Sequence, residues 1–135
     1  MWEVVDLIPK KEDMLRALEE RQGKELQKKF AAAAVAVCGL GGLGSNIAVS
    51  LARAGIGRLV LIEFDKVDIT NLHRQQYKAN QVGCRKTEAL AENLREIAPY
   101  TEFVIHTVKI TEENAAELLA DTQIICEAFD NAECK

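Results

Sequence analysis

Short apolar runs alternate with longer amphipathic stretches along most of the chain. Four of these runs are rich in Ala, Val and Ile, and this pattern predicts buried strands. We expect the strands within residues 31–38, 58–65, 101–108 and 123–130. Strands of this kind are typical of a parallel sheet that is covered on both faces.

Between the predicted strands, apolar residues recur at helical spacing. Residues 10–29 carry this pattern, and we expect Gly23 to break the segment into two pieces. A further helix is expected over residues 45–55, because its apolar residues are followed by Gly55, a residue that commonly caps helix C-termini.

Two more helices are expected in the second half of the chain. Leu90, Leu94 and Ile97 recur at i, i+4 and i+7, and Pro99 ends the run, which indicates an amphipathic helix. Thr111 is expected to cap the N-terminus of the next helix, and the two glutamates that follow it favour the helix dipole. The alternation of strands and helices predicts an α/β fold with a mostly parallel sheet and helices on both faces.

Length, composition and charge narrow the class of protein. The chain has 135 residues, of which 48% are hydrophobic and 28% charged, and this suits one compact domain. Its net charge of −4 makes a nucleic-acid partner unlikely, because nucleic acids attract basic surfaces. No apolar run approaches the ~20 residues that span a bilayer, so no membrane partner is expected. The N-terminal residues also lack the features of a signal peptide.

The four cysteines favour a reducing, cytoplasmic location. Cys38 and Cys126 lie in predicted strands and are expected to be small core residues, whereas Cys84 and Cys134 lie in probable loops. No C-x-x-C pair occurs, so a structural zinc site within this chain is unlikely.

A glycine-rich segment between the first strand and the next helix fits a phosphate-binding loop. Gly39, Gly41 and Gly44 match the pattern G-x-G-x-x-G, and Gly42 lies in the same loop. The first glycine permits a tight turn, the second lets the backbone approach a phosphate, and the third lets helix and strand pack closely. A tight turn without a ligand is the alternative explanation.

Two acidic residues follow the second predicted strand. Glu63 lies 24 positions after Gly39, where an acidic side chain typically accepts hydrogen bonds from a ribose hydroxyl, and Asp65 comes two residues later. A solvated strand end is the simpler alternative. These features alone indicate a bound nucleotide, and an NAD-dependent oxidoreductase is the default interpretation.

The loop after Asp65 supplies groups that a dinucleotide site does not need. It contains Asn71, Arg74 and Gln75, and Lys86 follows at the start of the next helix. Arg74 can bind a phosphate with two hydrogen bonds, and Lys86 acts as a point charge. These groups favour a triphosphate, although solvated surface charges are an alternative.

A further carboxylate is expected at the same edge of the sheet. Asp130 ends the fourth predicted strand, and a carboxylate there can hold Mg²⁺, which prefers oxygen ligands and nucleotide phosphates. The alternative is that Asp130 only caps a turn.

Four segments of the chain resemble the ThiF/MoeB/HesA family, the bacterial relatives of ubiquitin-activating enzymes. The N-L-x-R-Q element is the most specific of the shared motifs, and the resemblance runs from about Arg21 to the last residue. The segments are "GLGGLGSNIAVSLARAGIG", "LIEFDKVDITNLHRQQY", "VGCRKTEAL" and "FDN". The resemblance implies a Rossmann-like nucleotide-binding domain at residues 31–135, preceded by a helical segment at residues 1–30.

This family resemblance implies an adenylyltransferase that uses ATP and Mg²⁺. The C-terminal carboxylate of a ubiquitin-like sulfur-carrier protein attacks the α-phosphate of ATP, and pyrophosphate leaves. By the same resemblance, Glu63 binds the ribose, and Asp130 binds Mg²⁺. The phosphates are held by Arg74, Gln75 and Lys86.

The resemblance also has finer implications. Arg21 resembles an arginine that such enzymes place near the ATP phosphates, often across a homodimer interface. Cys84-Arg85 stands where relatives often have a residue followed by proline. The long leader resembles a ThiF-like subgroup that is associated with thiamine biosynthesis and a ThiS-like carrier. Family members continue past "FDN", so we expect an N-terminal fragment, truncated on its C-terminal side.

Three alternatives to the sulfur-carrier adenylyltransferase stay open at this point. The first is a tRNA threonylcarbamoyladenosine dehydratase-like member of the same superfamily. The second is an NAD-dependent Rossmann oxidoreductase. The third is a nucleotide-binding module that has lost its catalytic function.

Overall fold

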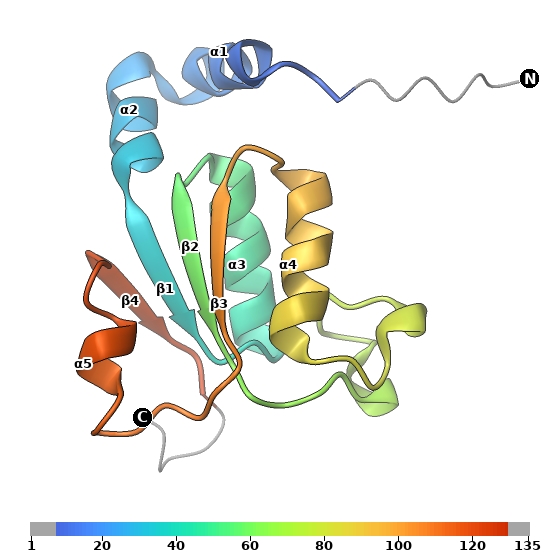
Figure 1. The fold of residues 1–135 in the computed structure, drawn as a ribbon. Coiled ribbons are helices and arrows are strands. Elements are labelled where there is room, and N and C mark those ends of the chain that lie inside the picture. The colour runs from blue at the N-terminus through green and yellow to red at the C-terminus, as the bar shows by residue number, and fades with distance from the viewer. Residues whose placement is uncertain (1–7, 130–135) are drawn as a thin grey trace, which may run out of the picture.

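A four-stranded parallel sheet forms the centre of the structure, a computed structural model that describes residues 8–129 (Figure 1). Helices and strands alternate as the sequence predicts, so the α/β, Rossmann-like fold is confirmed. The elements are α1 (Lys11–Gln22), α2 (Lys24–Ala32), β1 (Ala34–Cys38), α3 (Gly42–Ala54), β2 (Arg58–Ile62), α4 (Lys86–Ile97), β3 (Glu102–His106), α5 (Ala115–Leu118) and β4 (Ile124–Glu127).

The order of the strands in the sheet is β3-β2-β1-β4, and every neighbouring pair is parallel. In the register of the sheet, Val35 of β1 lies between Leu59 of β2 and Ile124 of β4. The chain moves outward from β1 to β3 and then crosses back to place β4 on the other side of β1. Ligands of open α/β sheets bind at the carboxyl ends of the strands where the order reverses, which here is between β1 and β4.

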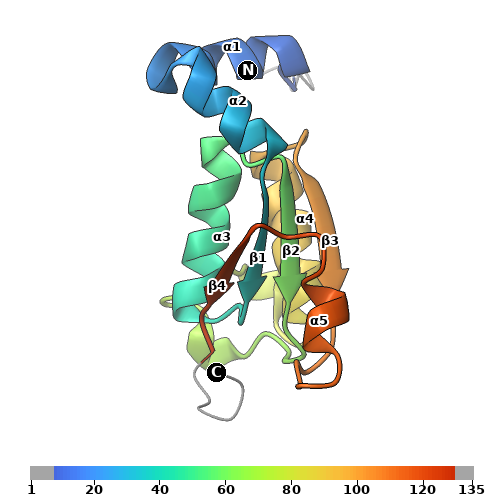
Figure 2. The same cartoon turned by 90° about the vertical axis from the view of Figure 1, so that its left-hand side faces the viewer.

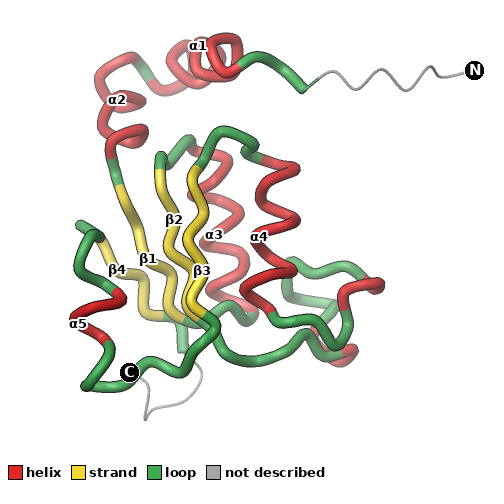
Figure 3. Tube along the Cα trace, in the orientation of Figure 1, coloured by secondary structure: helices red, strands yellow, loops and turns green. Residues whose placement is uncertain are grey.

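One face of the sheet is covered by α3 and α4, and this face carries the larger core (Figure 3). Val37 and Leu61 point to this side from β1 and β2, and Leu90 and Leu94 meet them from α4. All four side chains are completely buried. The prediction of an amphipathic helix is therefore confirmed, and each of these leucines contributes about 1.5–3 kcal/mol of burial free energy.

The opposite face of the sheet is covered by fewer helical residues than the sequence predicts. Alternate residues of β1 and β2, such as Ala36 and Ile62, pack against Ile110, Leu118 and Leu119 around the four-residue helix α5. This helix is shorter than expected. The Thr111 hydroxyl does accept the N–H of residue 114, at 3.4 Å, as a cap would, but residues 112–114 form a turn before the helix begins.

Strand β4 differs most from the prediction. It spans only Ile124–Glu127, and the side chains of Ile124 and Ile125 are 55% and 50% exposed. Cys126 packs against the core but is half-buried, so the expectation that it is a core residue like Cys38 holds only in part. The physical reason is position: within residues 8–129, β4 lies at the edge of the sheet and pairs with β1 alone.

Other element boundaries moved by a few residues. The first strand begins at Ala34 because Ala31 and Ala32 continue α2, and α3 begins at Gly42, inside the glycine-rich segment. The strands at 58–65 and 101–108 end earlier than expected, at Ile62 and His106.

Helices α1 and α2 lie across the end of the sheet at which the strands begin (Figure 2). The predicted break between them at Gly23 is confirmed, as is the end of α3 at Gly55, whose N–H bonds the carbonyl of Ala52 at 3.1 Å. No helix within the described range is long and apolar enough to cross a membrane.

Candidate functional site

The glycine-rich loop follows β1 at the carboxyl edge of the sheet, and two of its glycines are required by close contacts. Gly39 has φ +94°, and a Cβ there would lie 2.7 Å from the carbonyl oxygen of Ala128. A Cβ on Gly44 would collide with the carbonyl oxygen of Gly39. The loop therefore turns back tightly on itself and packs against the segment that follows β4.

The glycine-rich loop leads directly into the N-terminus of α3. Gly41 precedes the helix without a capping side chain, and Gly42 is its first residue. The first N–H groups of an α-helix have no partner within the helix, and the helix dipole adds a partial positive charge there. This end of α3 can bind an anion, with the dipole contributing about 0.3–1 kcal/mol.

The carboxylate of Glu63 lies beside the same loop. One oxygen accepts the N–H of Leu40 at 3.1 Å, and the other accepts the N–H of Phe64 at 3.1 Å. Each oxygen keeps a free lone pair, so the half-exposed carboxylate can still accept hydrogen bonds from hydroxyl groups of a ligand. The side chain of Asp65, two residues later, is exposed.

Arg74 lies in the loop between β2 and α4, which folds back over the start of α3. Its guanidinium rests against Gly42, where a Cβ would be only 2.5 Å from Nη1. The Arg74 side chain is exposed, and it forms no ion pair with any acidic residue among residues 8–129. The structure thus brings this predicted site residue to the helix end that can bind an anion.

Side chains of α3 hold the Arg74 segment in place. The Asn46 Nδ2 donates to the carbonyl oxygens of Gly42, at 2.6 Å, and Arg74, at 3.2 Å. The Asn46 Oδ1 accepts a hydrogen bond from Nε2 of Gln76 at 2.7 Å, and the hydroxyl of Ser45 accepts the N–H of Gln76 at 3.2 Å. Sequence reasoning missed Ser45 and Asn46, although two consecutive polar residues directly after the glycine-rich segment were a usable signal.

Tyr77 links the loop that carries Arg74 to the glycine-rich segment. Its hydroxyl donates to the carbonyl oxygen of Leu40 at 2.6 Å, and the side chain is buried. Burial, and secondly the charge of Glu63, raises the pKa of the Tyr77 hydroxyl well above its usual value. The hydroxyl therefore stays protonated and remains a donor.

Lys86 is the first residue of α4, and it is only 7% exposed. Within the described part of the chain, its ammonium has neither an ion pair nor a hydrogen bond of the side chain. Hydrogen bonds from Thr70 lower the pKa of Asp68, and the positive charge of Lys86 adds to this effect. A lysine at this edge of the sheet that forms no ion pair within the described residues is available to an anionic ligand.

Two further predicted phosphate ligands are placed differently. The carbonyl oxygen of Asn71 accepts the N–H groups of Arg74 and Gln75, at 3.2 and 3.0 Å, so its main chain shapes the turn. Gln75 is 6% exposed, and its side-chain oxygen is buried without a hydrogen-bond partner in the described residues. Direct contacts from these two side chains to a phosphate stay predictions.

Asp130 and Cys134 lie outside the described residues. Among residues 8–129, no three His, Cys, Asp or Glu side chains form a group that could hold a metal ion. Arg21 is exposed at the end of α1, across the opposite end of the sheet from the glycine loop of its own chain. A contact from Arg21 to phosphates at that loop would therefore have to come from another copy of the chain.

Two cysteines near the carboxyl edge have opposite environments. Cys38 is buried at the end of β1, and burial raises the pKa of its thiol to about 11. Cys84 is exposed in the loop before α4. Both placements confirm the expectations from the sequence.

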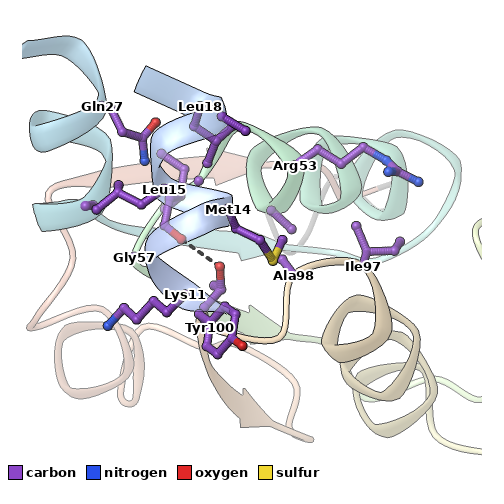
Figure 4. Close-up of a pocket in the computed structure, with 16 residues that line it drawn as sticks. Lys11, Met14, Leu15, Leu18, Gln27, Arg53, Gly57, Ile97, Ala98 and Tyr100 are labelled. Carbon is purple, nitrogen blue, oxygen red and sulfur yellow. Dashed lines mark hydrogen bonds between the residues drawn. The ribbon is translucent and has the colours of Figure 1, made fainter. Parts of the chain in front are cut away.

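A large hollow lies away from these residues, at the amino end of the sheet (Figure 4). It is a groove of about 580 Å³ between α1 and the helix ends below it. Met14, Leu15 and Leu18 line it from α1, and Ile97 and Tyr100 line it from below. Most of this lining is apolar, in contrast to the charged surroundings of the glycine loop.

Comparison with known proteins identifies relatives over most of the chain. Residues 14–135 match the ThiF family. The "Adenylyltransferase and sulfurtransferase MOCS3" of Caenorhabditis briggsae is 38% identical over 106 residues, which cover 78% of this chain and 26% of the relative. The "Sulfur carrier protein adenylyltransferase" of Thermus thermophilus is 36% identical over 110 residues, 81% of this chain and 41% of the relative. The chain thus spans well under half the length of these two relatives.

A solved structure matches even more of the chain. Escherichia coli TcdA, a tRNA N6-threonylcarbamoyladenosine dehydratase solved in complex with ATP, aligns with a TM-score of 0.86 at 30% identity. The alignment covers 94% of this chain and 54% of the TcdA chain.

Proposed function

Because the chain belongs to the ThiF family, we propose that it is the nucleotide-binding part of an ATP-dependent adenylyltransferase. The substrate that we propose is the C-terminal carboxylate of a ubiquitin-like sulfur-carrier protein. Relatives named as adenylyltransferases of sulfur carriers support this choice. The observation that carries the proposal is the placement of Arg74 and Lys86 at one edge of the sheet without acidic partners in the described residues.

The described residues offer separate groups for the ribose and for the phosphates of ATP. Glu63 accepts hydrogen bonds from the ribose, because its carboxylate keeps free lone pairs beside the glycine loop. The N-terminus of α3 and the guanidinium of Arg74 meet at Gly42 and receive phosphate oxygens. Lys86 adds a second cation from the start of α4.

Such an arrangement suits the chemistry of adenylation. A carboxylate must approach an anionic phosphate, and negative charge then grows on the leaving pyrophosphate. Cations that are held in place before the reaction stabilise this charge more in the transition state than in the ground state. We further propose that Mg²⁺ joins the phosphates with Asp130 as its protein ligand, since Mg²⁺ is usually bound by one or two carboxylates plus phosphate oxygens.

Replacing Arg74 in the whole protein tests this role directly. We expect Arg74→Ala to lower the rate of carrier-dependent ATP–pyrophosphate exchange by ~10²-fold or more, because a fixed cation at the leaving group is lost. Arg53→Ala is the matched control, since Arg53 is an exposed arginine in the last turn of α3, at the opposite end of the same helix. Unchanged exchange in Arg74→Ala would remove Arg74 from the mechanism.

Nucleotide binding separates the proposal from an oxidoreductase. Calorimetric titration is expected to show binding of ATP with Mg²⁺ and none of NAD at the same concentration. The reverse result would favour the NAD-dependent oxidoreductase. Binding of ATP without any exchange, with each candidate carrier present, would favour a module that has lost its catalytic function.

A dehydratase that activates a carboxylate on tRNA is the second candidate. One observation favours it: the structural likeness to TcdA covers 94% of the chain with a TM-score of 0.86. Pyrophosphate exchange that depends on threonylcarbamoyl-modified tRNA, and not on a sulfur carrier, would decide for this function.

Finer details of the proposal follow the sequence resemblance. We propose that the carrier is ThiS-like and serves thiamine biosynthesis, that the whole protein is cytoplasmic, and that it forms a homodimer. We also propose that Arg21 reaches the phosphates across the dimer. Sedimentation analysis of the whole protein with and without Arg21→Ala, together with exchange rates, separates an effect on assembly from an effect on catalysis.

A further inference from the structure

We propose that Asn46 is a positioning residue, which holds Arg74 over the first turn of α3. This inference rests on the proposed function, in which Arg74 receives phosphate oxygens. Asn46 lies one helical turn after Gly42 and is itself exposed. Its amide bridges the two segments that carry the proposed phosphate-binding groups.

The hydrogen bonds of Asn46 use its whole amide group. Its two N–H bonds are directed to the carbonyl oxygens of Gly42 and Arg74, which belong to segments that lie far apart in sequence. Its oxygen accepts one hydrogen bond, from the amide of Gln76. Both hydrogens of the Asn46 amide are used within the protein, so the residue cannot donate to a phosphate and acts on it through its neighbours.

The position of the Arg74 guanidinium depends on its main chain. In the described part of the chain, the Arg74 side chain has no ion pair that could fix it. Its main-chain N–H is bonded to Asn71 and its carbonyl oxygen to Asn46. Loss of the Asn46 bond frees the carbonyl side of Arg74, and a shift of about 1 Å in a positioned group can cost 10²-fold in rate.

Asn46 is distinguishable from the other groups that fasten this loop. Tyr77 is buried, so its removal would disturb the core as well as the loop. Ser45 is also buried and bonds Gln76 but not Arg74. Only Asn46 among these three contacts both Gly42 and Arg74, and it does so from the surface.

A double-mutant cycle in the whole protein tests the proposal. We expect Asn46→Ala to lower pyrophosphate exchange by ~10-fold, mainly in kcat, because hydrogen bonds that orient a charged group are lost. In the Arg74→Ala background, the same replacement should change the rate by less than about 2-fold, because nothing is left to position. Equal fold-changes in both backgrounds would overturn the inference.

Two additional variants exclude a general loss of structure. Gln22→Ala is the matched control, because the Gln22 amide bonds the carbonyl of Ala54 at the other end of α3, and it should leave exchange unchanged. Asn46→Asp keeps the acceptor for Gln76 but places an oxygen against two carbonyls, so it should be at least as slow as Asn46→Ala. Wild-type exchange in Asn46→Asp would contradict the inference.

Hydrogen–deuterium exchange gives a readout that does not depend on turnover. The main-chain N–H groups of residues 74–77 should exchange ~5-fold faster in Asn46→Ala than in wild type and be unchanged in Gln22→Ala. If Arg74→Ala leaves catalysis intact while these N–H groups loosen in Asn46→Ala, the role of Arg74 fails but Asn46 still holds the loop. If the N–H groups are unaffected, Asn46 does not hold the loop, whatever the catalytic result.

Discussion

The two ends of the same sheet differ in how tightly they are packed and in the charged side chains around them. At the amino end, α1 covers a groove of about 580 Å³ with a mostly apolar lining. At the carboxyl end, the glycine loop is packed so tightly that two of its glycines have no room for a Cβ. This apolar groove is therefore not where the polar groups converge.

Basic residues at the two ends also differ in their partners. Arg58, at the start of β2, forms an ion pair with Glu102 at 3.7 Å. Arg74 and Lys86, at the carboxyl end, have no such partner within the described residues. An ion-paired arginine on a strand contributes to the fold, whereas unpaired cations beside a helix N-terminus are typical of an anion site. The candidate site is therefore marked by unpaired cations that lie beside the N-terminus of a helix, and not by the size of a cavity.

The largest effect that this comparison predicts is at Gly44. We expect Gly44→Ala to lower the free energy of unfolding by about 1–3 kcal/mol and to abolish ATP binding, because the new methyl group must displace the carbonyl of Gly39. Denaturant unfolding and calorimetry measure the two effects. Ser50→Ala, at an exposed position of the same helix, should change neither. Normal ATP binding by Gly44→Ala would show that the loop geometry is not required.

Replacement of Lys86 is expected to affect ATP binding far more than stability. In Lys86→Met, an apolar side chain of similar length keeps the packing of this largely buried residue, so we expect stability without ligand to change by less than about 1 kcal/mol. ATP binding should weaken by ~10-fold or more, because the charge partner of the phosphates is lost. Thermal unfolding with and without ATP measures both.

Lys78→Met is the matched control for that experiment. Lys78 is exposed and pairs with Glu96 at 3.1 Å, so its removal should change stability by less than about 1 kcal/mol and leave ATP binding intact. If Lys86→Met destabilised the protein and left ATP binding unchanged, Lys86 would be a structural residue, and the contrast between the two ends of the sheet would weaken.

At the amino end of the sheet, we expect replacement of Leu18 to lower the free energy of unfolding without changing the affinity for ATP. Leu18 is half-buried on α1 and lines the groove. Leu18→Ala removes part of this packing and should cost about 1 kcal/mol of stability, with ATP affinity unchanged. Weaker ATP binding in this variant would show that the groove and the glycine loop are coupled, contrary to the comparison.

The sequence predicted the parts of the fold that depend on local patterns. The glycine spacing was sufficient to predict the loop after β1. The spacing of the leucines was sufficient to predict the buried face of α4, because that face follows from the helix period alone. The exposure of β4 was not predictable in this way. Ile124 and Ile125 look like core residues in sequence, and only the strand order places them at an edge.

The sequence pointed to the residues that we propose face the ligand, and it missed the residues that support them. Arg74 and Lys86 stood out because cations after strand ends are unusual in a dinucleotide site. The hydrogen bonds from Asn46 to Arg74 and from Tyr77 to Leu40 join residues that are 28 and 37 positions apart. No local sequence pattern predicts contacts between residues so far apart. The division into residues 1–30 and 31–135 stays a prediction, although α2 itself continues to Ala32.

The smallest expected effect concerns the two thiols near the carboxyl end. Alkylation requires a thiolate, and burial holds the pKa of Cys38 at about 11 even though cations lie at the same edge. At pH 8 we therefore expect iodoacetamide to modify Cys84, which is exposed, and to spare Cys38. Mass spectrometry of peptides from folded protein identifies the modified residue.

The pH dependence of the same reaction sharpens the result. Because the raised pKa favours the protonated thiol, the reactivity of Cys38 should rise ~10-fold per pH unit and level off only near pH 11, provided that the protein stays folded. A Cys38 that reacts as fast as Cys84 at pH 8 would mean that the positive charge at this edge reaches the end of β1. The cations would then affect the buried end of β1 as well as the surface of the loop. The contrast in charge between the two ends of the sheet would then have to be described differently.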